Sequence, residues 1–447
     1  MQLFNALKLK FENSDWSSNP EFGLIDTLLE LHPDLILLLK DDIVGKECNS
    51  NFGRKDTPTV EQIVRAAIYK EMKGIDYREL EYAQIDSRIC ANFIKLDSRK
   101  PYSFQMFQKY ISRIKESSLQ KVLIEINKIA ITEGFEDIVK IRQDSFVVKS
   151  NIHYPTNNSL VWDCIKESHR LLEHLNEEIS TLSYRDYIKS AKKTYFKINN
   201  TKSEDKRTEL FNKQLITFTK TINQVTNAIK KKSGSLTAML IQMSLRKLLP
   251  LMNQVYSMTY WKEILKESMP NDEKIFSIYE QHTDIIVKGG REVLFGHKVN
   301  LTSCKSNLIL DCEVLRGNPS DKVLYPQSLD RIIENYDKIP RDSATDGGFA
   351  CLKNMEYARN KGIVNIVFNK IVGSLRNAVS SLNMETRLKK WRSGIEANIS
   401  NLMRGFNIRV CVWKGWAHFQ AKVLWSVLGY NFRIMTAIAI GRMTVKI

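Results

Sequence analysis

The order in which strand and helix patterns follow one another is the feature that most restricts the fold of this chain. One apolar segment, at 138–148, has the composition of a buried strand, and Asp144 interrupts it. A long helical pattern then runs from about 161 to 279. Beyond it we expect strands at 284–287, 293–301 and 308–315, a short one ending at Asp346, and one at 363–368, with helices at 324–336, 351–360, about 385–406 and about 416–440. This mixed order predicts an α/β fold whose sheet has an antiparallel part and a parallel part.

The residues before the first strand, 57–134, have a helical pattern. Thr59 stands three residues before Gln62, which is the spacing of a capping box at a helix start. Two more helical segments are expected near 77–93 and 103–132. Short helices in series suit a helix-turn-helix-like DNA-binding module, and on pattern alone they suit an ordinary helical bundle equally well.

The charge of the chain indicates a polyanionic partner. There are 67 Lys and Arg against 50 Asp and Glu, a formal net charge of +17, in a chain that is 43% apolar and can therefore bury a core. Nucleic acid and an anionic membrane surface both fit such a charge. Residues 185–247 hold 15 Lys and Arg against 4 Asp and Glu, more than solubility requires. We therefore expect DNA contacts there, with phosphate neutralisation that makes binding salt-sensitive, through Lys192, Lys193, Lys230, Lys231 and Lys232.

Cysteine usage and hydropathy bear on the compartment. The seven cysteines are scattered and contain no CxxC pair, which argues against a zinc ribbon and a disulfide framework. No uninterrupted apolar run approaches the roughly 18 residues that span a bilayer, and the first residues lack a signal-peptide pattern. We therefore expect a cytoplasmic, nucleoid-associated protein with no membrane partner.

Three acidic residues form a candidate metal site. Asp144 interrupts a strand, Asp346 ends one directly before two glycines, and Glu396 lies on an amphipathic helix. A carboxylate within a strand is costly to bury unless it is paired or metal-bound. Converging carboxylates suit Mg²⁺, and two such ions about 4 Å apart can activate an attacking oxygen and stabilise a leaving one. From spacing alone the signal is weak, because a chain of 447 residues offers many carboxylate triplets.

The residues around these carboxylates are more specific. The segments are RQDSFVVKSNIHYPTNNSLVWDCIK (142–166), HTDIIVKGGREVLFGHKVNLTS (282–303), LILDCEVLRGNPSD (308–321), ATDGGFA (344–350) and KKWRSGIEANISNLMRGFNIRVCVWKGWAHF (389–419). Taken together and in this order, they resemble the DDE transposases of bacterial insertion sequences, in particular the ISNCY-type group. The resemblance runs from about residue 57 to the end of the sequence.

The resemblance implies a function and roles for particular residues. Asp144, Asp346 and Glu396 would be the catalytic and metal-binding triad, with Mg²⁺ as cofactor and Mn²⁺ able to substitute. Such enzymes bind the terminal inverted repeats of an element, cleave DNA at its ends and transfer the 3′ ends to target DNA. Arg392, four residues before the glutamate, matches a family position that contacts the DNA end. Met403 occupies a second, usually basic position, and Arg404 beside it is the alternative basic contact.

The resemblance and the element order together give a domain organisation. The element order is that of a ribonuclease-H-like mixed sheet with a long helical insertion after the first strand, preceded by a helical N-terminal domain. Because two DNA ends must be brought together, we expect a homodimer on double-stranded DNA. The expected parts are an arm or subdomain at 1–56, a DNA-binding or dimerisation domain at 57–136, a catalytic domain at 137–160 and 280–447, and a Lys-rich helical insertion at 161–279.

Several residues have competing interpretations. Asp311 and Asp321 are alternatives to Asp346, although a strand-edge or turn role explains each more simply. Asp346 is favoured because its glycines let backbone approach closely. Lys298 could contact a phosphate, whereas His297 is expected to be structural. His153 suits a role near the site and a structural role equally, and core packing is favoured over stacking on an unpaired base for Trp391, Trp413 and Trp416.

Two other functions remain open. The chain could be a domesticated or decayed transposase that binds DNA ends without cutting them, a reading that Met403 favours and the three carboxylates oppose. It could also be a metal-dependent DNA nuclease of the same fold that hydrolyses DNA without strand transfer. Separate measurements of DNA binding, cleavage and joining distinguish these functions.

Overall fold

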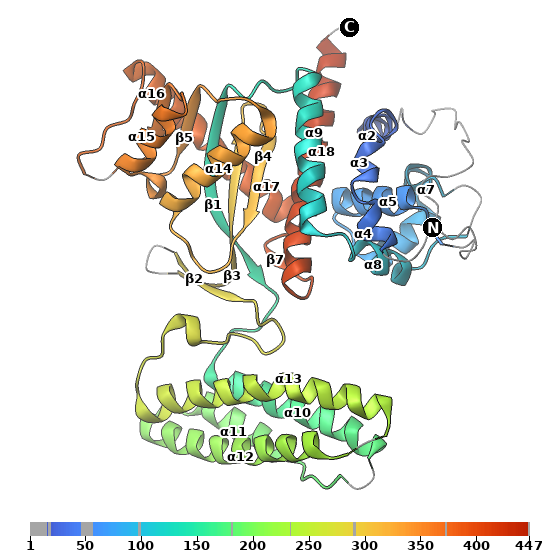
Figure 1. Cartoon of the computed structure of the whole chain (residues 1–447), viewed down its shortest axis with the longest axis vertical. Helices are drawn as coiled ribbons and strands as arrows, with labels where there is room; N and C mark the ends of the chain where they lie inside the picture. The colour runs from blue at the N-terminus through green and yellow to red at the C-terminus, as the bar shows by residue number, and fades with distance from the viewer. Residues whose placement is uncertain are drawn as a thin grey trace. The chain divides into compact units, whose positions relative to one another are not determined.

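The computed structural model is that of a mixed α/β protein, mostly helical, with a seven-stranded mixed sheet and an N-terminal helical region (Figure 1). The chain forms two compact units, described separately below: a first unit of Met1–Lys149 and Gly296–Ile447, and a second unit of Ser150–Phe295. The residues that the structure describes are Trp16, 19–45, 57–96, 100–179, 182–232, 234–288, 292–371 and 373–445. Much of the expected arm at 1–56 lies outside them.

The N-terminal region of the first unit consists of short helices, which the pattern predicted for 57–134 but not for 20–44. The predicted capping box is present, because Thr59 N donates to Gln62 Oε1 (3.0 Å) and Gln62 N donates to Thr59 Oγ1 (3.2 Å). The helix that follows is buried along nearly its whole length, and its Arg65 is neutralised by Asp26 at 2.5 Å. The helices are α2 (Pro20–Leu31), α3 (Asp34–Leu37), α4 (Lys40–Val44), α5 (Val60–Lys73), α6 (Tyr77–Asp86), α7 (Arg88–Ile94), α8 (Phe104–Ile111) and α9 (Glu116–Thr132).

The sheet has the predicted mixture of antiparallel and parallel pairs. Its strand order is β2-β3-β1-β5-β6, with β4 also pairing with β3 and β7 with β1. β1 pairs antiparallel with β3 and parallel with β5, and β5 pairs parallel with β6. The strands are β1 (Lys140–Ser150), β2 (Asp284–Lys288), β3 (Glu292–Cys304), β4 (Ile309–Val314), β5 (Asp342–Thr345), β6 (Asn365–Phe368) and β7 (Val410–Cys411).

Different helices of the first unit meet the two faces of β1. Gln143 donates to the Leu324 carbonyl of α14 (Asp321–Tyr336), which packs with α15 (Leu352–Asn360). Its neighbour Arg142 points to the other face and donates to the Trp391 carbonyl at the end of α16. Because successive side chains of a strand alternate, Asp144 lies on the same face as Arg142, with α16 and α17.

The prediction of one continuous helix at about 385–406 is wrong. The structure has two helices, α16 (Leu382–Arg392) and α17 (Gly394–Gly405), with a break at Ser393. Arg142 Nη1 donates to the Trp391 carbonyl at 2.7 Å and lies 2.1 Å from where a Cβ on Gly394 would be. A buried guanidinium from a distant strand thus takes up a carbonyl at the end of α16, and the helical pattern of the segment itself carries no sign of it.

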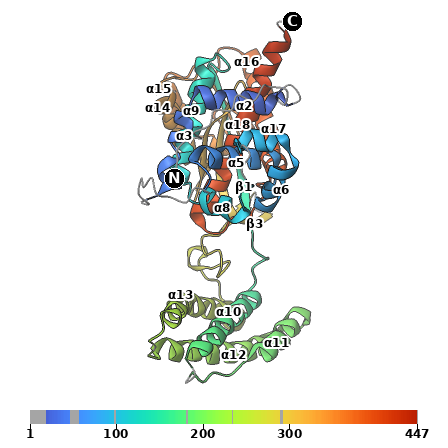
Figure 2. The same cartoon turned by 90° about the vertical axis from the view of Figure 1, so that its right-hand side faces the viewer.

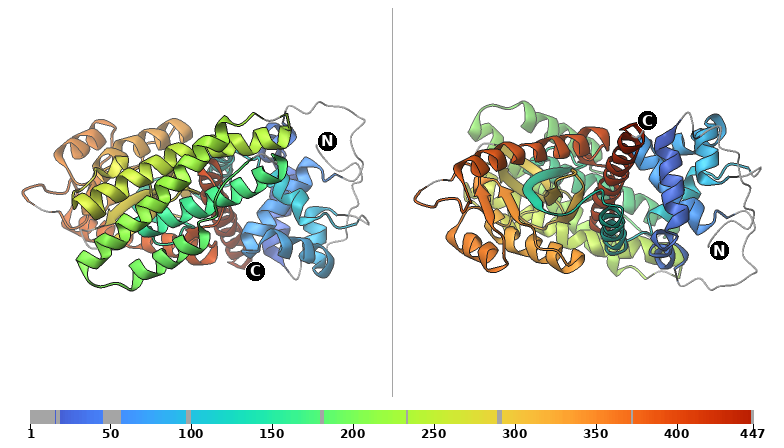
Figure 3. Two further views of the ribbon diagram at one scale, coloured as in Figure 1. Left: turned by 90° about the horizontal axis from the view of Figure 1, so that it is seen from below. Right: turned by 90° about the horizontal axis from the view of Figure 1, so that it is seen from above.

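The expectation that no segment is long and apolar enough to cross a membrane is also wrong. By length and composition, residues Trp416–Gly441 of α18 (Trp416–Val445) meet that requirement. However, 67% of the apolar window is buried inside the protein, where α18 packs against α9, α5, α2 and β4 (Figures 1 and 3). One mostly buried helix of this kind is weak evidence for a membrane span, because core helices pass the same test.

The second unit contains four long helices that pack around their own apolar core (Figure 2). Thr156 caps the first of them by accepting a hydrogen bond from Ser159 N. The helices are α10 (Asn157–Glu178), α11 (Ile188–Asn200), α12 (Glu204–Lys230) and α13 (Leu236–Thr259), followed by the π-helix η1 (Tyr260–Leu265). The Lys-rich stretch of the sequence therefore forms a helical bundle with a core that includes Leu172, Phe218, Leu245 and Val255.

Candidate active site

Strand pairing brings two of the three predicted carboxylates together. The parallel register of β1 and β5 pairs Gln143 with Thr345, so the next residues, Asp144 within β1 and Asp346 just after β5, lie side by side. Directly after Asp346 the chain passes very close to another segment. A Cβ on Gly347 would lie 2.7 Å from the carbonyl oxygens of both Asn369 and Lys370. Glycine is therefore required there, as the sequence predicted for this Gly pair.

The third carboxylate reaches the same place through Arg392. The buried Arg392 guanidinium lies between the three acidic groups, with Nη2 2.7 Å from Asp144 Oδ2 and 4.0 Å from Asp346 Oδ1, and with Nη1 3.2 Å from Glu396 Oε1. The side chains differ in exposure, at 18% for Asp144, 44% for Asp346 and 67% for Glu396. The three carboxylates that the sequence singled out thus converge on one arginine where β5 ends, beside the middle of β1.

These carboxylates match Mg²⁺ in their chemistry but do not enclose an ion in this arrangement. Oxygen donors from three acidic side chains are what Mg²⁺ prefers. Within the described part of the chain, however, no three His, Cys, Asp or Glu side chains are close enough to hold a metal ion. The Arg392 guanidinium supplies the positive charge between them instead. A metal ion would therefore bind here only after Arg392 moves.

Asp311 and Asp321 occupy different surroundings. Asp311 is bound by Arg331 through two hydrogen bonds of 2.8 Å and accepts a third from Ser328 at 2.6 Å, so its carboxylate is saturated. Asp321 begins α14 and accepts a hydrogen bond from Ser145 at 2.9 Å. Because Ser145 points away from the face that carries Asp144, neither alternative joins the cluster around Arg392.

Two residues of β3 that were considered near the site are buried. Lys298 lies 2.6 Å from Asp321 Oδ1 and donates to the Pro319 carbonyl at 2.8 Å, so it is engaged within the protein. The His297 ring packs edge-on against Trp416 and Phe419, with centroids 4.6 and 4.8 Å away. Its surroundings are those of a core residue.

Met403, at the position that is usually basic, and its neighbour Arg404 differ in how far their side chains are buried. Met403 is partly buried and packs against the apolar core, whereas Arg404 is exposed in the last turn of α17. Arg404 is therefore the basic side chain that solvent, or a DNA strand, can reach at this end of the helix.

The remaining predicted DNA-binding residues belong to the second unit. Five lysines of the helical bundle are all exposed: Lys192, Lys193, Lys230, Lys231 and Lys232. His153, in the segment before α10, lies 3.3 Å from Asp163, so it has an ion-pair partner within its own unit.

The tryptophans near Glu396 in sequence mostly serve packing. Trp413 stacks on Tyr77 with ring centroids 6.3 Å apart, and Trp416 packs against His297. Trp391 lies beside two cations, with Lys140 Nζ 4.7 Å and Arg142 Cζ 4.8 Å from its ring centre.

Sequence reasoning missed Arg142, which connects β1 to both helices of the site. Besides the Trp391 carbonyl, it donates to Ser303 at 3.0 Å and to Asn398 at 3.3 Å. Burial lowers the pKa of this guanidinium from its ordinary value. Its one sequence signal is an arginine two residues before Asp144 within an apolar strand, where a charge needs several partners. By joining α16 and α17 to β1, Arg142 helps to hold Arg392 and Glu396 beside Asp144.

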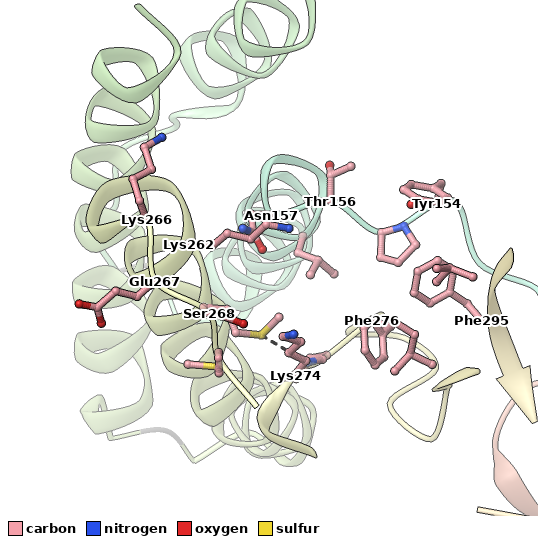
Figure 4. Close-up of a pocket in the computed structure, with 17 residues that line it drawn as sticks. Tyr154, Thr156, Asn157, Lys262, Lys266, Glu267, Ser268, Lys274, Phe276 and Phe295 are labelled. Carbon is pink, nitrogen blue, oxygen red and sulfur yellow. Dashed lines mark hydrogen bonds between the residues drawn. The ribbon is translucent and has the colours of Figure 1, made fainter. Parts of the chain in front are cut away.

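The second unit contains a cavity of about 570 Å³ that sequence reasoning also missed (Figure 4). The rings of Tyr154, Phe276 and Phe295 line one side, with centroids 5.3 to 5.4 Å apart. Of the lysines at its edge, Lys266 pairs with Glu204 at 3.4 Å. The cavity is thus largely apolar, and none of the predicted site residues lines it.

Comparison with known proteins adds no relative. No protein-family model, no curated protein and no solved structure matches the chain.

Proposed function

We propose that this protein is a DNA transposase of the DDE type, with a ribonuclease-H-like catalytic fold and the helical bundle as an insertion after its first strand. One observation carries the proposal: Asp144, Asp346 and Glu396, far apart in sequence, converge around Arg392 where β5 ends, beside the middle of β1. The enzyme would bind the terminal inverted repeats of an insertion sequence, cleave the phosphodiester at each end and transfer the 3′ ends to target DNA.

The proposed chemistry depends on positioning and on charge. Asp144, Asp346 and Glu396 would hold Mg²⁺, or Mn²⁺ in its place, which supplies activation of the attacking oxygen and stabilisation of the leaving one. The chain itself contributes a rigid frame, because Asp144 is fixed in a central strand and Glu396 is tied to it through Arg392. When released from the carboxylates, Arg392 is placed to bind a phosphate of the DNA end with its planar guanidinium.

Exposed positive charge supports DNA as the substrate. The five exposed lysines of the bundle and Arg404 on α17 are available to neutralise phosphates. Two transposon ends have to be cut together, so a homodimer with two-fold symmetry is expected. The proposed location is the cytoplasm, at the nucleoid.

The test uses the DNA that flanks the gene as substrate. Inverted repeats found there define the duplex, and cleavage is followed on labelled ends in Mg²⁺. Asp144→Asn, Asp346→Asn and Glu396→Gln should each reduce cleavage by more than about 100-fold, because each removes a direct metal ligand. Glu356→Gln, an exposed glutamate on α15, is the matched control and should cleave like the parent. If the three triad variants retain cleavage, the assignment is wrong.

One feature favours a second candidate, a DNA-binding protein that does not cut. Arg392 neutralises the three carboxylates, and Met403 replaces a usually basic residue. Binding measured by fluorescence anisotropy without any cleavage in Mg²⁺ or Mn²⁺ would favour this candidate. Cleavage without joining of a pre-cleaved 3′ end to plasmid DNA would instead indicate a nuclease.

A further inference from the structure

The first unit also contains a cavity, of about 540 Å³, at the N-terminal end of β1 and β5, whereas the carboxylates lie farther along these strands. It opens where Lys140 begins β1 and Asp342 begins β5, and α16 forms one wall. Five cations line it, together with the ring of Trp391: Lys140, Lys305, Arg341, Arg387 and Lys390.

The positive charge of this cavity is not balanced. Lys305 has Asp137 at 3.6 Å, and Arg341 has Asp342 at 2.9 Å. The other three cations, Lys140, Arg387 and Lys390, have no carboxylate within 4 Å in the part of the chain that the structure describes. The cavity is therefore suited to an anion with more than one negative charge.

The surroundings of Lys140 support the same conclusion. Partial burial lowers the pKa of its ammonium group, and the positive charges of Lys305, Arg387 and Arg142 lower it further against the opposing effect of the Asp342 carboxylate. The Trp391 ring lies 4.7 Å from Lys140 Nζ and forms a rigid wall beside it. An anion in the cavity would relieve this crowding of like charges.

The cavity and the carboxylates lie on the same face of the sheet. Lys140, Arg142 and Asp144 alternate along β1, so their side chains point to one side. At about 3.3 Å per residue, Lys140 and Asp144 are about 13 Å apart along the strand. Because a DNA strand carries one phosphate for every nucleotide, a strand that passes the carboxylates can also place a phosphate in the cavity.

We propose that this basic cavity binds the phosphodiester backbone of a DNA strand, within a few nucleotides of the bond at the carboxylates. Its occupant is chosen by charge: a strand supplies phosphates at regular intervals, and Arg387 and Lys390 extend the positive charge along the exposed side of α16. Anion binding follows from the cavity alone, whereas the position of the cavity beside a cleaved bond rests on the function proposed above.

The experiment measures how DNA binding depends on salt. Full-length protein is titrated onto a labelled duplex by fluorescence anisotropy in EDTA, so no metal or cleavage is involved. Each phosphate contact contributes about 0.9 to the slope of log K against log salt concentration. The double variant Arg387→Gln/Lys390→Gln should therefore reduce the slope by about 1.8. The control Lys353→Gln/Arg359→Gln removes two exposed cations from α15 and should change the slope much less.

Equal slopes for the cavity variant and the control would overturn the proposal. Inorganic triphosphate provides a second arm as competitor. If it binds the parent and not the cavity variant while the DNA slopes of the two agree, the cavity holds a free anion and the DNA assignment is wrong. A reduced slope in the cavity variant supports the site even if the carboxylate variants cleave normally, so failure of the proposed function and failure of the cavity are distinguishable.

Discussion

Replacing Arg392 tests whether the three carboxylates form a cation site. In Arg392→Gln the glutamine is too short and uncharged, so Asp144, Asp346 and Glu396 lose their common counter-ion. The contact with Asp144, at 2.7 Å and largely buried, is a charge-assisted hydrogen bond that contributes about 1.5–3 kcal/mol. The other two carboxylates are more exposed, and each contributes about 0–1 kcal/mol. We expect the unfolding free energy of the first unit to fall by about 1.5–5 kcal/mol.

Mg²⁺ should reverse this loss. In the parent an ion has to displace Arg392, whereas in the variant no guanidinium lies between the carboxylates. An ion at 100 times its Kd stabilises the folded state by about 2.7 kcal/mol, which lies within the range of the loss expected from the substitution. Thermal unfolding with and without MgCl₂, followed by circular dichroism, should therefore show a larger Mg²⁺-induced rise in Tm for the variant than for the parent.

The matched control is Arg331→Gln. Arg331 binds Asp311 and Glu313 at 2.8 and 2.9 Å in the same unit, so its loss should destabilise the protein similarly. Only two carboxylates remain there, and we expect no comparable recovery in Mg²⁺. If Mg²⁺ raises the Tm of the Arg392 variant no more than that of the parent, the carboxylates do not form a cation site.

Three further substitutions test the frame of the first unit. Burial tends to raise the pKa of Glu71, but its two lysine neighbours outweigh burial and hold this pKa below the ordinary value. The stabilisation by this carboxylate is therefore present above the unfolded pKa and is lost as pH falls through the folded pKa. Lys422→Met should cost about 3–5 kcal/mol and move acid unfolding, followed by circular dichroism, to higher pH. Asn431→Leu removes the acceptor of a buried backbone N–H and should cost about 1–3 kcal/mol in denaturant unfolding, and an unchanged midpoint would show that the bond contributes nothing. Gly394→Ala places a methyl group against Arg142, so it should destabilise the protein and reduce DNA cleavage, whereas Gly234→Ala, which meets no atom within 4 Å, should do neither.

The helices, the strands and the mixed sheet were predicted from patterns of neighbouring residues within each segment of the sequence. The capping box of Thr59 and Gln62, the strand at 138–148 and the helices around β5 and β6 all depend on residue spacing within a few turns or strand positions. Single-segment patterns therefore located most helices and strands to within a few residues.

The sequence predictions were wrong where contacts with residues far away in the sequence determine the structure. The break at Ser393 depends on Arg142, which comes from a strand about 250 positions earlier. The apolar length of α18 was missed because scattered polar residues interrupt its apolar runs, and only packing against α9, α5 and α2 shows where its apolar surface lies.

For the candidate site, the sequence by itself selected Asp144, Asp346 and Glu396 as residues of interest and Arg392 as their neighbour. The tertiary structure decided that these groups meet, that Arg392 lies between the carboxylates, and that a basic cavity lies on the same face of β1. The physical reason is that propensity and periodicity are properties of one segment, whereas electrostatic neutralisation depends on which charges the folded chain brings within a few ångströms of each other.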